Sequence, residues 1–377
     1  MAKVHITLVG GQPEPVYNGI MYNEPDKVLF IYSDQSTKLE MIENMVKKNS
    51  ARRETEFYRE KFNAQKVQKI SSRLKKLFEN GNDYFTKDDD VTINLTGGTK
   101  AWSILFFDYF KGFKNVSFHL VDQNNNMYDI TNDKTIKIKV LGIADTFSLH
   151  GIKIKENSVL DDYTEADFNA INTIHEIRKY NYKHFRELTK ELSNQTNKSE
   201  ANYKCSSIKY NKSNNKNIRD IVFQLDDGKS CIKKWTVTSP NIRKLIINTG
   251  WFEVEVARLL HEVYPEAQML LNCKLKFASD KTEKEKNEID IVMKINDKLL
   301  FVECKTNVYD ITDVNKFNEV AEIAGGKACK RIFFTLDKMD DAAQENCDER
   351  HILRLLSSDT KDEIKKKIDE YLAISNA

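Results

Sequence analysis

The sequence predicts an α/β protein with two domains, each built on a sheet that helices cover. Three observations lead to this prediction. Strand-like and helix-like runs alternate through residues 3–140, a second α/β pattern fills 241–377, and a polar stretch at 193–217 lies between them. Alternation at this spacing is typical of a mostly parallel, doubly wound sheet. A length of 377 residues is enough for two such domains and an insert.

The N-terminal domain is predicted to span residues 1–150. Runs of β-branched and aromatic residues predict its strands at 4–10, 27–33, 91–96 and 115–122, with a hairpin over 127–140. Between the second and third of these strands, residues 36–81 predict two charged amphipathic helices. An apolar helix is expected after Lys100.

Residues 151–240 are predicted to form a helical linker with a polar insert. Helical periodicity covers 164–181 and 185–192, and the stretch 193–217, rich in Asn, Lys and Ser, predicts a loop or a partly disordered segment. A hairpin is predicted around Asp226–Lys229. Basic residues and two tyrosines are interleaved near this stretch: Tyr203, Lys204, Lys209, Tyr210, Lys212, Lys216 and Arg219. This composition suits single-stranded nucleic acid, and it suits a solvated linker as well.

The C-terminal domain is predicted over residues 241–377 as an α/β/α unit. Its pattern is helix, strand, hairpin, helix, strand and helix, and Ser239-Pro240 is a favourable helix start.

Net charge, cysteine spacing and the length of apolar runs exclude several classes of protein. A net charge of +2 is too small to attract nucleic acid to the whole molecule, so any contact with nucleic acid must use local basic patches. The six cysteines all lie in the C-terminal half, and none is close enough to another for a zinc-knuckle or redox spacing. There is no cleavable signal pattern, and no apolar run approaches the ~18 residues of a membrane span. The sequence therefore predicts a cytoplasmic protein with no membrane partner.

The most informative pattern is a predicted β-hairpin formed by residues 287–295 and 298–305, with Asn296-Asp297 as its turn. A two-residue turn places Asp290 directly opposite Glu303, whereas a three-residue turn would shift the register by one. Opposed like charges on a strand pair are destabilising, so a cation between them is expected. Carboxylate oxygens suit a divalent metal.

A simpler reading is also open. With the same turn, Glu288 lies opposite Lys305, and the two could form a salt bridge on an edge strand. Asp290 and Glu303 would then be merely solvated.

The hairpin resembles the core of the PD-(D/E)xK nuclease superfamily, in which an Asp precedes a Glu-x-Lys strand. This resemblance implies a restriction-endonuclease-like domain in which Asp290, Glu303 and the main-chain carbonyl of Cys304 hold Mn²⁺ or Mg²⁺. It also implies that Lys305 orients the attacking water or offsets phosphate charge. A further catalytic Glu is usual on the preceding helix, and Glu253 is the candidate.

The assignment of Glu253 rests on its position at the start of a predicted helix that follows Gly250. The same helix carries Glu255 and Glu262, which leaves alternatives for this role.

A second candidate site lies at the carboxyl ends of the N-terminal strands. Ligands bind at such ends in open parallel sheets, and glycine loops at helix N-termini receive phosphates. The expected ligand-binding residues follow the first, second and third predicted strands: Gly10, Gly11, Gln12, Ser33, Thr96, Gly97, Gly98, Thr99 and Lys100. An ordinary tight turn with a capping threonine would give the same local pattern.

The segment Asn94–Lys100 after a hydrophobic strand resembles the signature of CARF domains, the CRISPR-associated Rossmann fold. Such a domain followed by a PD-(D/E)xK domain is similar to ancillary nucleases of type III CRISPR antiviral systems. The resemblance implies a homodimer that binds a cyclic oligoadenylate, most simply cyclic tetra-adenylate. It implies a metal-dependent endonuclease acting on nucleic acid, with single-stranded DNA as the main expectation and duplex DNA or RNA as further substrates.

Two other functions fit parts of the pattern. One is a ligand-responsive, DNA-binding transcriptional regulator whose C-terminal domain does no chemistry. An unregulated restriction or repair nuclease would use the N-terminal domain only to dimerise.

Overall fold

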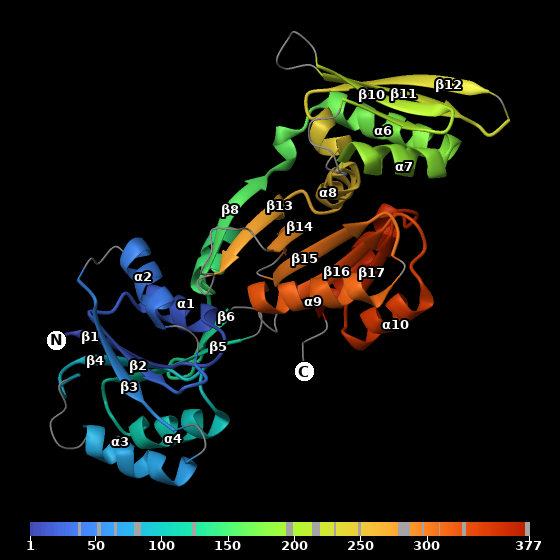
Figure 1. Cartoon of the computed structure of the whole chain (residues 1–377). Coiled ribbons are helices and arrows are strands. Elements are labelled where there is room, and N and C mark those ends of the chain that lie inside the picture. Colours follow the sequence, from blue (N-terminus) through green and yellow to red (C-terminus); the bar gives the residue numbers. More distant parts are fainter. Residues whose placement is uncertain are drawn as a thin grey trace.

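The computed structural model describes the chain apart from residues 37–38, 51–53, 64–65, 79–83, 123–125, 194–198, 213–218, 230, 248–249, 278–286, 296–297, 309, 326–328 and 374–377. Figure 1 shows three parts: an N-terminal domain in blue and teal, an insert in green and yellow, and a C-terminal domain mostly in orange and red. The predicted α/β class with an N-terminal, mostly parallel sheet is confirmed.

The N-terminal sheet has the strand order β3-β2-β1-β4-β5-β6-β7. The strands are β1 (Lys3–Leu8), β2 (Lys27–Tyr32), β3 (Glu56–Lys61), β4 (Asp90–Asn94), β5 (Val116–Val121), β6 (Asn126–Asp129) and β7 (Lys134–Lys137). Strands β1 to β5 are parallel, and β6 and β7 form the predicted hairpin extension. The order reverses between β1 and β4, which makes their carboxyl ends the switch point of the sheet.

Helices cover both faces of this sheet (Figure 1). One face packs against α1 (Glu14–Asn23) and α2 (Leu39–Asn49), and the other against α3 (Ile70–Phe78) and α4 (Lys100–Phe110), with the short turn η1 (Val67–Lys69) before α3. The prediction of helices alone over 36–81 was wrong, because β3 lies between α2 and α3. Its sequence EFYREK is charged, which suits an edge strand.

The insert consists of two helices under an antiparallel sheet with the order β12-β11-β10-β9. Its elements are α6 (Glu165–Tyr180), α7 (Tyr182–Ser193), β9 (Glu200–Tyr203), β10 (Ser206–Lys212), β11 (Arg219–Asp226) and β12 (Ile232–Ser239). The prediction of a loop over 193–217 was therefore wrong for β9 and β10. Alternate residues Ala201, Ile208 and Tyr210 are buried in the insert core, a pattern that the high Asn, Lys and Ser content conceals.

The C-terminal sheet has the order β17-β16-β15-β14-β13-β8. Its strands are β8 (Ile152–Ser158), β13 (Gln268–Phe277), β14 (Asn287–Ile295), β15 (Lys298–Lys305), β16 (Lys330–Thr335) and β17 (Leu353–Leu356). One face packs against α8 (Trp251–Val263) and α11 (Lys361–Ala373), the other against α9 (Ile311–Gly325) and α10 (Asp341–Glu349). These layers form the predicted α/β/α unit, although β8 comes from the segment before residue 240.

The chain enters the C-terminal domain differently from the prediction. Strand β12 continues through Ser239, and the turn η3 (Arg243–Ile247), a π-helical turn, precedes α8, so no regular helix begins at Ser239-Pro240. A second short turn, η2 (Leu160–Asp162), connects β8 to α6.

Helix α5 (Ile143–Leu149) joins the N-terminal and C-terminal domains. Leu149 is buried among α1 and α2 of the N-terminal domain, whereas Phe147 stacks on Phe301 of β15 with 5.9 Å between ring centroids. His150 Nε2 lies 2.7 Å from Glu14 Oε1, at the start of α1. Strand β8 follows at once, so α5 connects the two cores. Among the described residues, no helix is long and apolar enough to cross a bilayer.

Candidate active site and ligand site

The structure confirms the predicted register of the hairpin. Strands β14 and β15 pair from Ile295 with Lys298 to Ile291 with Val302, although the turn residues themselves lie outside the described part of the chain. The next position along this register holds Asp290 and Glu303. One oxygen of Asp290 accepts a hydrogen bond from the Cys304 main-chain N–H at 2.8 Å, which fixes this carboxylate at the end of β15.

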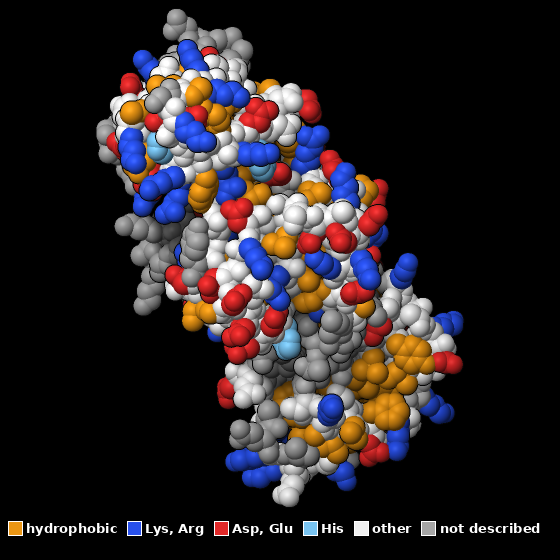
Figure 2. Space-filling view, turned by 90° about the vertical axis from the view of Figure 1, so that its right-hand side faces the viewer, with side chains coloured by type: hydrophobic (Ala, Val, Ile, Leu, Met, Phe, Trp, Pro, Cys, Tyr) orange, Lys and Arg blue, Asp and Glu red, His pale blue; other side chains and the backbone are white. Residues whose placement is uncertain are grey.

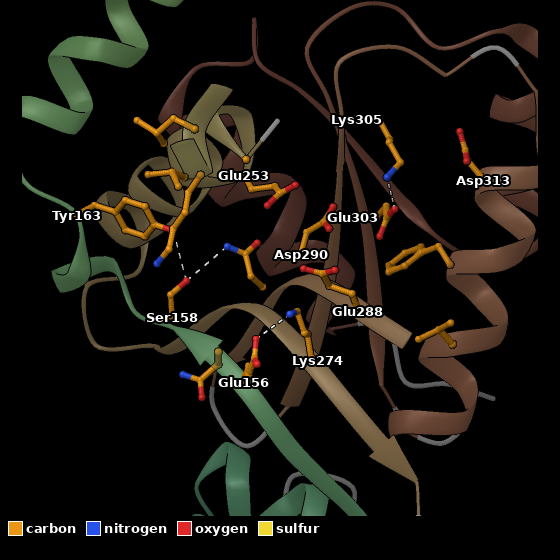
Figure 3. Close-up of a pocket in the computed structure, with 18 of the residues that line it drawn as sticks. Glu156, Ser158, Tyr163, Glu253, Lys274, Glu288, Asp290, Glu303, Lys305 and Asp313 are labelled. Carbon is orange, nitrogen blue, oxygen red and sulfur yellow. Dashed lines mark hydrogen bonds and ion pairs between the residues drawn. The ribbon is translucent and has the colours of Figure 1, made fainter. Parts of the chain in front are cut away.

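Glu303 and Lys305 project from the same face of β15, as expected for residues two apart on a strand (Figure 3). Lys305 Nζ lies 2.5 Å from Glu303 Oε1. The alternative salt bridge between Glu288 and Lys305 does not form, because within the described part of the chain Lys305 pairs with Glu303. Asp290 has no ion pair with a described side chain.

Glu253 lies in the first turn of α8 and points toward this cluster (Figure 3). Burial, and then the charge of Asp290, raise its pKa far above the ordinary value. Burial and the charge of Glu303 likewise raise the pKa of Asp290. Burial lowers the pKa of Lys305, but Glu303 and Asp290 outweigh it and hold that pKa above its usual range. The site is therefore a half-buried cluster of carboxyl groups with one charged lysine.

These side chains line a pocket of about 640 Å³ between α8, α9, β13 and β8. Sequence reasoning placed Glu253, Asp290, Glu303 and Lys305 here, and all four line the pocket. It missed most of the remaining wall, which includes Glu156, Ser158, Tyr163, Lys244, Asn272, Lys274, Asp313 and Lys316. Most of these come from β8, β13, η3 and α9, and only the tertiary fold brings them to the hairpin.

Asn272 is an unusual member of this wall. Its φ of 52° lies in the left-handed region, and it sits on β13 at the position that the β13–β14 register sets opposite Asp290. The pairing of β13 with β8 shifts register beside it. Its amide donates to Ser158 Oγ at 3.5 Å. Strained residues of this kind gather at functional sites, and Asn tolerates the conformation better than most side chains.

The donor set fits a hard divalent cation with several water ligands. Among the described residues, no three His, Cys, Asp or Glu side chains are arranged to hold a metal ion by themselves. Asp290 and Glu303 would therefore need the Cys304 carbonyl and water oxygens to complete the shell. Mg²⁺ commonly binds through one or two carboxylates and keeps several waters.

The N-terminal candidates lie in two loops that touch at the switch point. A Cβ atom on Gly97 would lie 1.9 Å from the Leu8 carbonyl oxygen, so only glycine fits there. Gly98 has a φ of 72°, which other residues rarely adopt. Gly10 packs against both glycines, whereas nothing lies within 4 Å of a Cβ built on Gly11. The loops after β1 and β4 therefore form one backbone surface.

The polar side chains predicted to bind the ligand differ in the hydrogen bonds that they form within the protein. Thr99 caps α4 by accepting from the Trp102 N–H at 3.3 Å, and Lys100 is exposed at the first position of that helix. The Thr96 hydroxyl accepts from the Val121 N–H at 2.7 Å and donates to Asn94, which holds it within the fold.

Ser33 accepts from the Gln35 N–H at 3.2 Å, and the neighbouring Ser36 hydroxyl donates to the Val9 carbonyl at 2.8 Å. Gln12 is half-buried in the loop after β1. Ser36 lies in the same polar strand end as Ser33. The groups best placed to meet an anion are the exposed Gly11 backbone and Lys100.

Two family models match the two ends of the chain. Residues 4–149 match the family model of the Card1 CARF domain, and residues 241–375 match the Card1-like endonuclease domain. The chain therefore carries a Card1-type CARF domain at its N-terminus and a Card1-like endonuclease domain at its C-terminus. A search of curated proteins found no match.

Three solved structures share the fold of this CARF nuclease. Can2 from Sulfobacillus thermosulfidooxidans, in complex with cyclic tetra-adenylate, has 16% identity and a TM-score of 0.67, covering 99% of this chain and 100% of Can2. Protein VC1899 from Vibrio cholerae has 15% identity and a TM-score of 0.68, covering 98% and 97%. A type III CRISPR defence DNA nuclease activated by cyclic oligoadenylate has 14% identity and a TM-score of 0.52. It aligns with 99% of this chain and only 52% of its own length.

Proposed function

We propose that this CARF nuclease is a metal-dependent endonuclease of type III CRISPR antiviral defence that cyclic tetra-adenylate activates and that cuts single-stranded DNA. The observation that carries the proposal is the cluster of Asp290, Glu303 and Lys305 on one hairpin, facing Glu253 across a pocket. The same chain carries a Card1 CARF domain. We take 1–150, 151–240 and 241–377 as its parts, with β8 completing the third.

The side chains divide the chemistry between them. Asp290, Glu303 and the Cys304 carbonyl would hold Mn²⁺ or Mg²⁺. When bound, such a cation polarises a phosphoryl oxygen and lowers the pKa of a bound water. Lys305, which stays charged, would position that water or offset the charge of the phosphate. Glu253, which faces these groups from the first turn of α8, would accept a hydrogen bond from a water ligand of the cation.

The activator would bind across two copies of the chain. A cyclic tetra-adenylate has rotational symmetry that includes a two-fold axis. If this axis coincides with the two-fold axis of a dimer, Gly11 and Lys100 of both copies face the same ring. Helix α4, which begins at this loop, exposes Ile104 (66%) and Phe107 (37%), and Phe113 is exposed just beyond its end. Exposed apolar side chains of this kind mark interaction surfaces, and we propose that they contribute to a homodimer. The complex of Can2 with cyclic tetra-adenylate supports the ring size.

The two alternative functions are less well supported. A non-catalytic regulator gives no reason for buried, like-charged carboxyl groups on a hairpin, because they destabilise the strand pair. An unregulated nuclease gives no reason for the open glycine surface of the N-terminal domain.

The proposal is tested by incubating the full chain with Mn²⁺ and with single-stranded DNA, supercoiled DNA or RNA, each with and without cyclic tetra-adenylate. We expect single-stranded DNA to be cut, with the activator raising the rate. Cleavage of none of these substrates under any condition would contradict the proposal. Preferential cleavage of RNA or duplex DNA would reassign the substrate.

A further inference from the structure

The insert is fixed directly beside the active-site hairpin. The Asn307 amide, two residues beyond Lys305, donates to Tyr182 Oη at 2.7 Å. Arg178 forms an ion pair with Asp337 at 2.6 Å and stacks on the Tyr182 ring. Helix α7 begins at Tyr182, so its first turn lies against the loop that leaves the catalytic strand.

Helix α7 also contacts the turn η3, which borders the pocket from another side. Lys244 of η3 lines the pocket, and its Nζ lies 6.0 Å from the centre of the Tyr163 ring. The helix therefore runs between two structures that border the pocket: the loop after Lys305 and the turn that carries Lys244.

The outer face of α7 carries a row of cations. Its inner face is buried, and Lys183, Arg186 and Lys190, at spacings of three and four residues, are exposed. Figure 2 shows Lys and Arg side chains spread over this upper part of the molecule. The flanking Glu187 approaches Arg186 only to 4.0 Å, and among the described residues no carboxylate forms an ion pair with Lys183 or Lys190. The row is thus available to an external anion.

The carboxyl groups in the wall of the pocket outnumber its lysines. Its wall carries Glu156, Glu253, Glu288, Asp290, Glu303 and Asp313. Two of its lysines are already paired, Lys274 with Glu156 at 2.7 Å and Lys305 with Glu303 at 2.5 Å. A nucleic acid strand that enters this pocket needs cations outside it, and α7 supplies them.

We propose that Lys183, Arg186 and Lys190, continued by Lys244, form a track that holds the phosphates of a single DNA strand and leads it into the pocket. This inference rests on the proposed nuclease function and adds the surface that its substrate uses. The row spans eight residues, or about 10 Å of helix. A flexible single strand can follow so short and straight a row, whereas the phosphates of a duplex curve away from it. Neutralised phosphates would make binding depend on salt.

The test compares the parental full chain with the triple variant Lys183→Glu, Arg186→Glu, Lys190→Glu. Binding of a fluorescent oligothymidine strand is measured in chelator, so that it is not cut, over a range of salt concentrations. We expect the affinity to fall by roughly tenfold or more, and the slope of log Kd against log salt to fall by about 2, since each contact contributes about 0.7. A neutral variant, Lys183→Gln, Arg186→Gln, Lys190→Gln, should change both quantities in the same direction by less.

A charge-matched control comes from the N-terminal domain. The exposed Lys69, Lys75 and Lys76, near and on α3, have no ion pair with a described carboxylate. Reversing these three charges should leave the affinity for oligothymidine at the parental value. If the α7 variant and this control variant weaken binding equally, the loss comes from the change in net charge, and the track is refuted.

A small substrate separates this inference from the proposed function. Bis(p-nitrophenyl) phosphate reaches only the pocket, so the α7 variant should cleave it at the parental rate with Mn²⁺ while its KM for the long strand rises. If the parental protein cleaves neither substrate, the nuclease function itself fails. If the parental protein cleaves both substrates, the nuclease function stands. The track is then refuted if the α7 variant binds oligothymidine as tightly as the parent, or if it loses only the binding of duplex DNA or RNA.

Discussion

The two sites occupy equivalent places in their sheets and have opposite electrical character. The ligand loops follow the carboxyl ends of β1 and β4, and Glu303 and Lys305 lie at the carboxyl end of β15. The N-terminal site offers backbone N–H groups and an exposed lysine, which suit an anion. The C-terminal site offers half-buried carboxyl groups, which suit a cation. Under the proposed function, the same position in a sheet would receive a phosphate-bearing activator in one domain and a metal ion in the other.

The largest effect is expected at the carboxylate site. Replacing Asp290, Glu303 or Lys305 with Ala should reduce cleavage by about a thousandfold or more, because in the proposed mechanism each group acts at the reacting phosphate or holds the metal ion beside it. Activator binding, measured by calorimetry, should stay at the parental value. Since Asp290 and Glu303 repel each other, Asp290→Ala should leave the thermal stability of the metal-free protein unchanged or raise it. The exposed Asp362→Ala serves as the control, and an active Glu303→Ala variant would remove the site assignment.

The hairpin and the glycine loops could be predicted because both are local. A two-residue turn fixes a register, so Asp290, Glu303 and Lys305 were placed without tertiary information, and Thr-Gly-Gly-Thr-Lys after a strand fixes a loop in the same way. Lys244 and Asn272 carry no local signal. They reach the pocket only because η3 and β13 pack beside the hairpin. The missed strands β3, β9 and β10 are charged or polar, and their alternation shows only once a buried face exists.

The stabilisation of the fold by a bound metal ion should depend on pH. Burial and the charge of Glu303 raise the pKa of Asp290 to about 7, so the metal-free fold favours its protonated form. That stabilisation is complete below the ordinary carboxyl pKa of about 4 and is lost as the pH rises through about 7. A cation needs the deprotonated carboxylates. The rise in Tm caused by Mn²⁺ should therefore be largest above that pKa and shrink below it.

Thermal unfolding with and without Mn²⁺ across this range measures the effect directly, and Asp290→Asn should abolish most of the rise. A rise in Tm that is independent of pH would place the bound ion elsewhere. Cleavage should stop in EDTA and return when Mn²⁺ or Mg²⁺ is added.

A smaller effect is expected at the ligand loop. Lys100→Ala should raise the activator concentration needed for half-maximal cleavage by about tenfold, through loss of a charge-assisted hydrogen bond at an exposed position. Thr99→Ala should act in the same direction by weakening the cap of α4. Cleavage at saturating activator should approach the parental rate. Lys114→Ala, beyond the other end of α4, is the control, and unchanged affinity in both variants would leave the loop as an ordinary turn.

The smallest effect concerns the connection between the sites. Glu14 opens α1 directly after the first ligand loop, and its partner His150 precedes β8, whose Glu156 and Ser158 line the pocket. His150→Ala should leave activator binding unchanged and reduce the maximal activation severalfold. Lys48→Ala, which removes a longer contact of 4.0 Å to Asp145 of α5, should have little effect. Equal losses in both variants would argue against a specific role for the Glu14–His150 contact.

Under the proposed function, occupation of the N-terminal site controls chemistry at the C-terminal site. This dependence is tested most directly by titrating the full chain with cyclic tetra-adenylate in Mn²⁺ and following ligand binding and single-strand cleavage on the same preparation. The account predicts that the cleavage rate rises with the bound fraction and saturates with it, because a ligand shifts an equilibrium only through differential affinity. A chain that binds the ring tightly and cuts at the same rate with and without it would contradict the account.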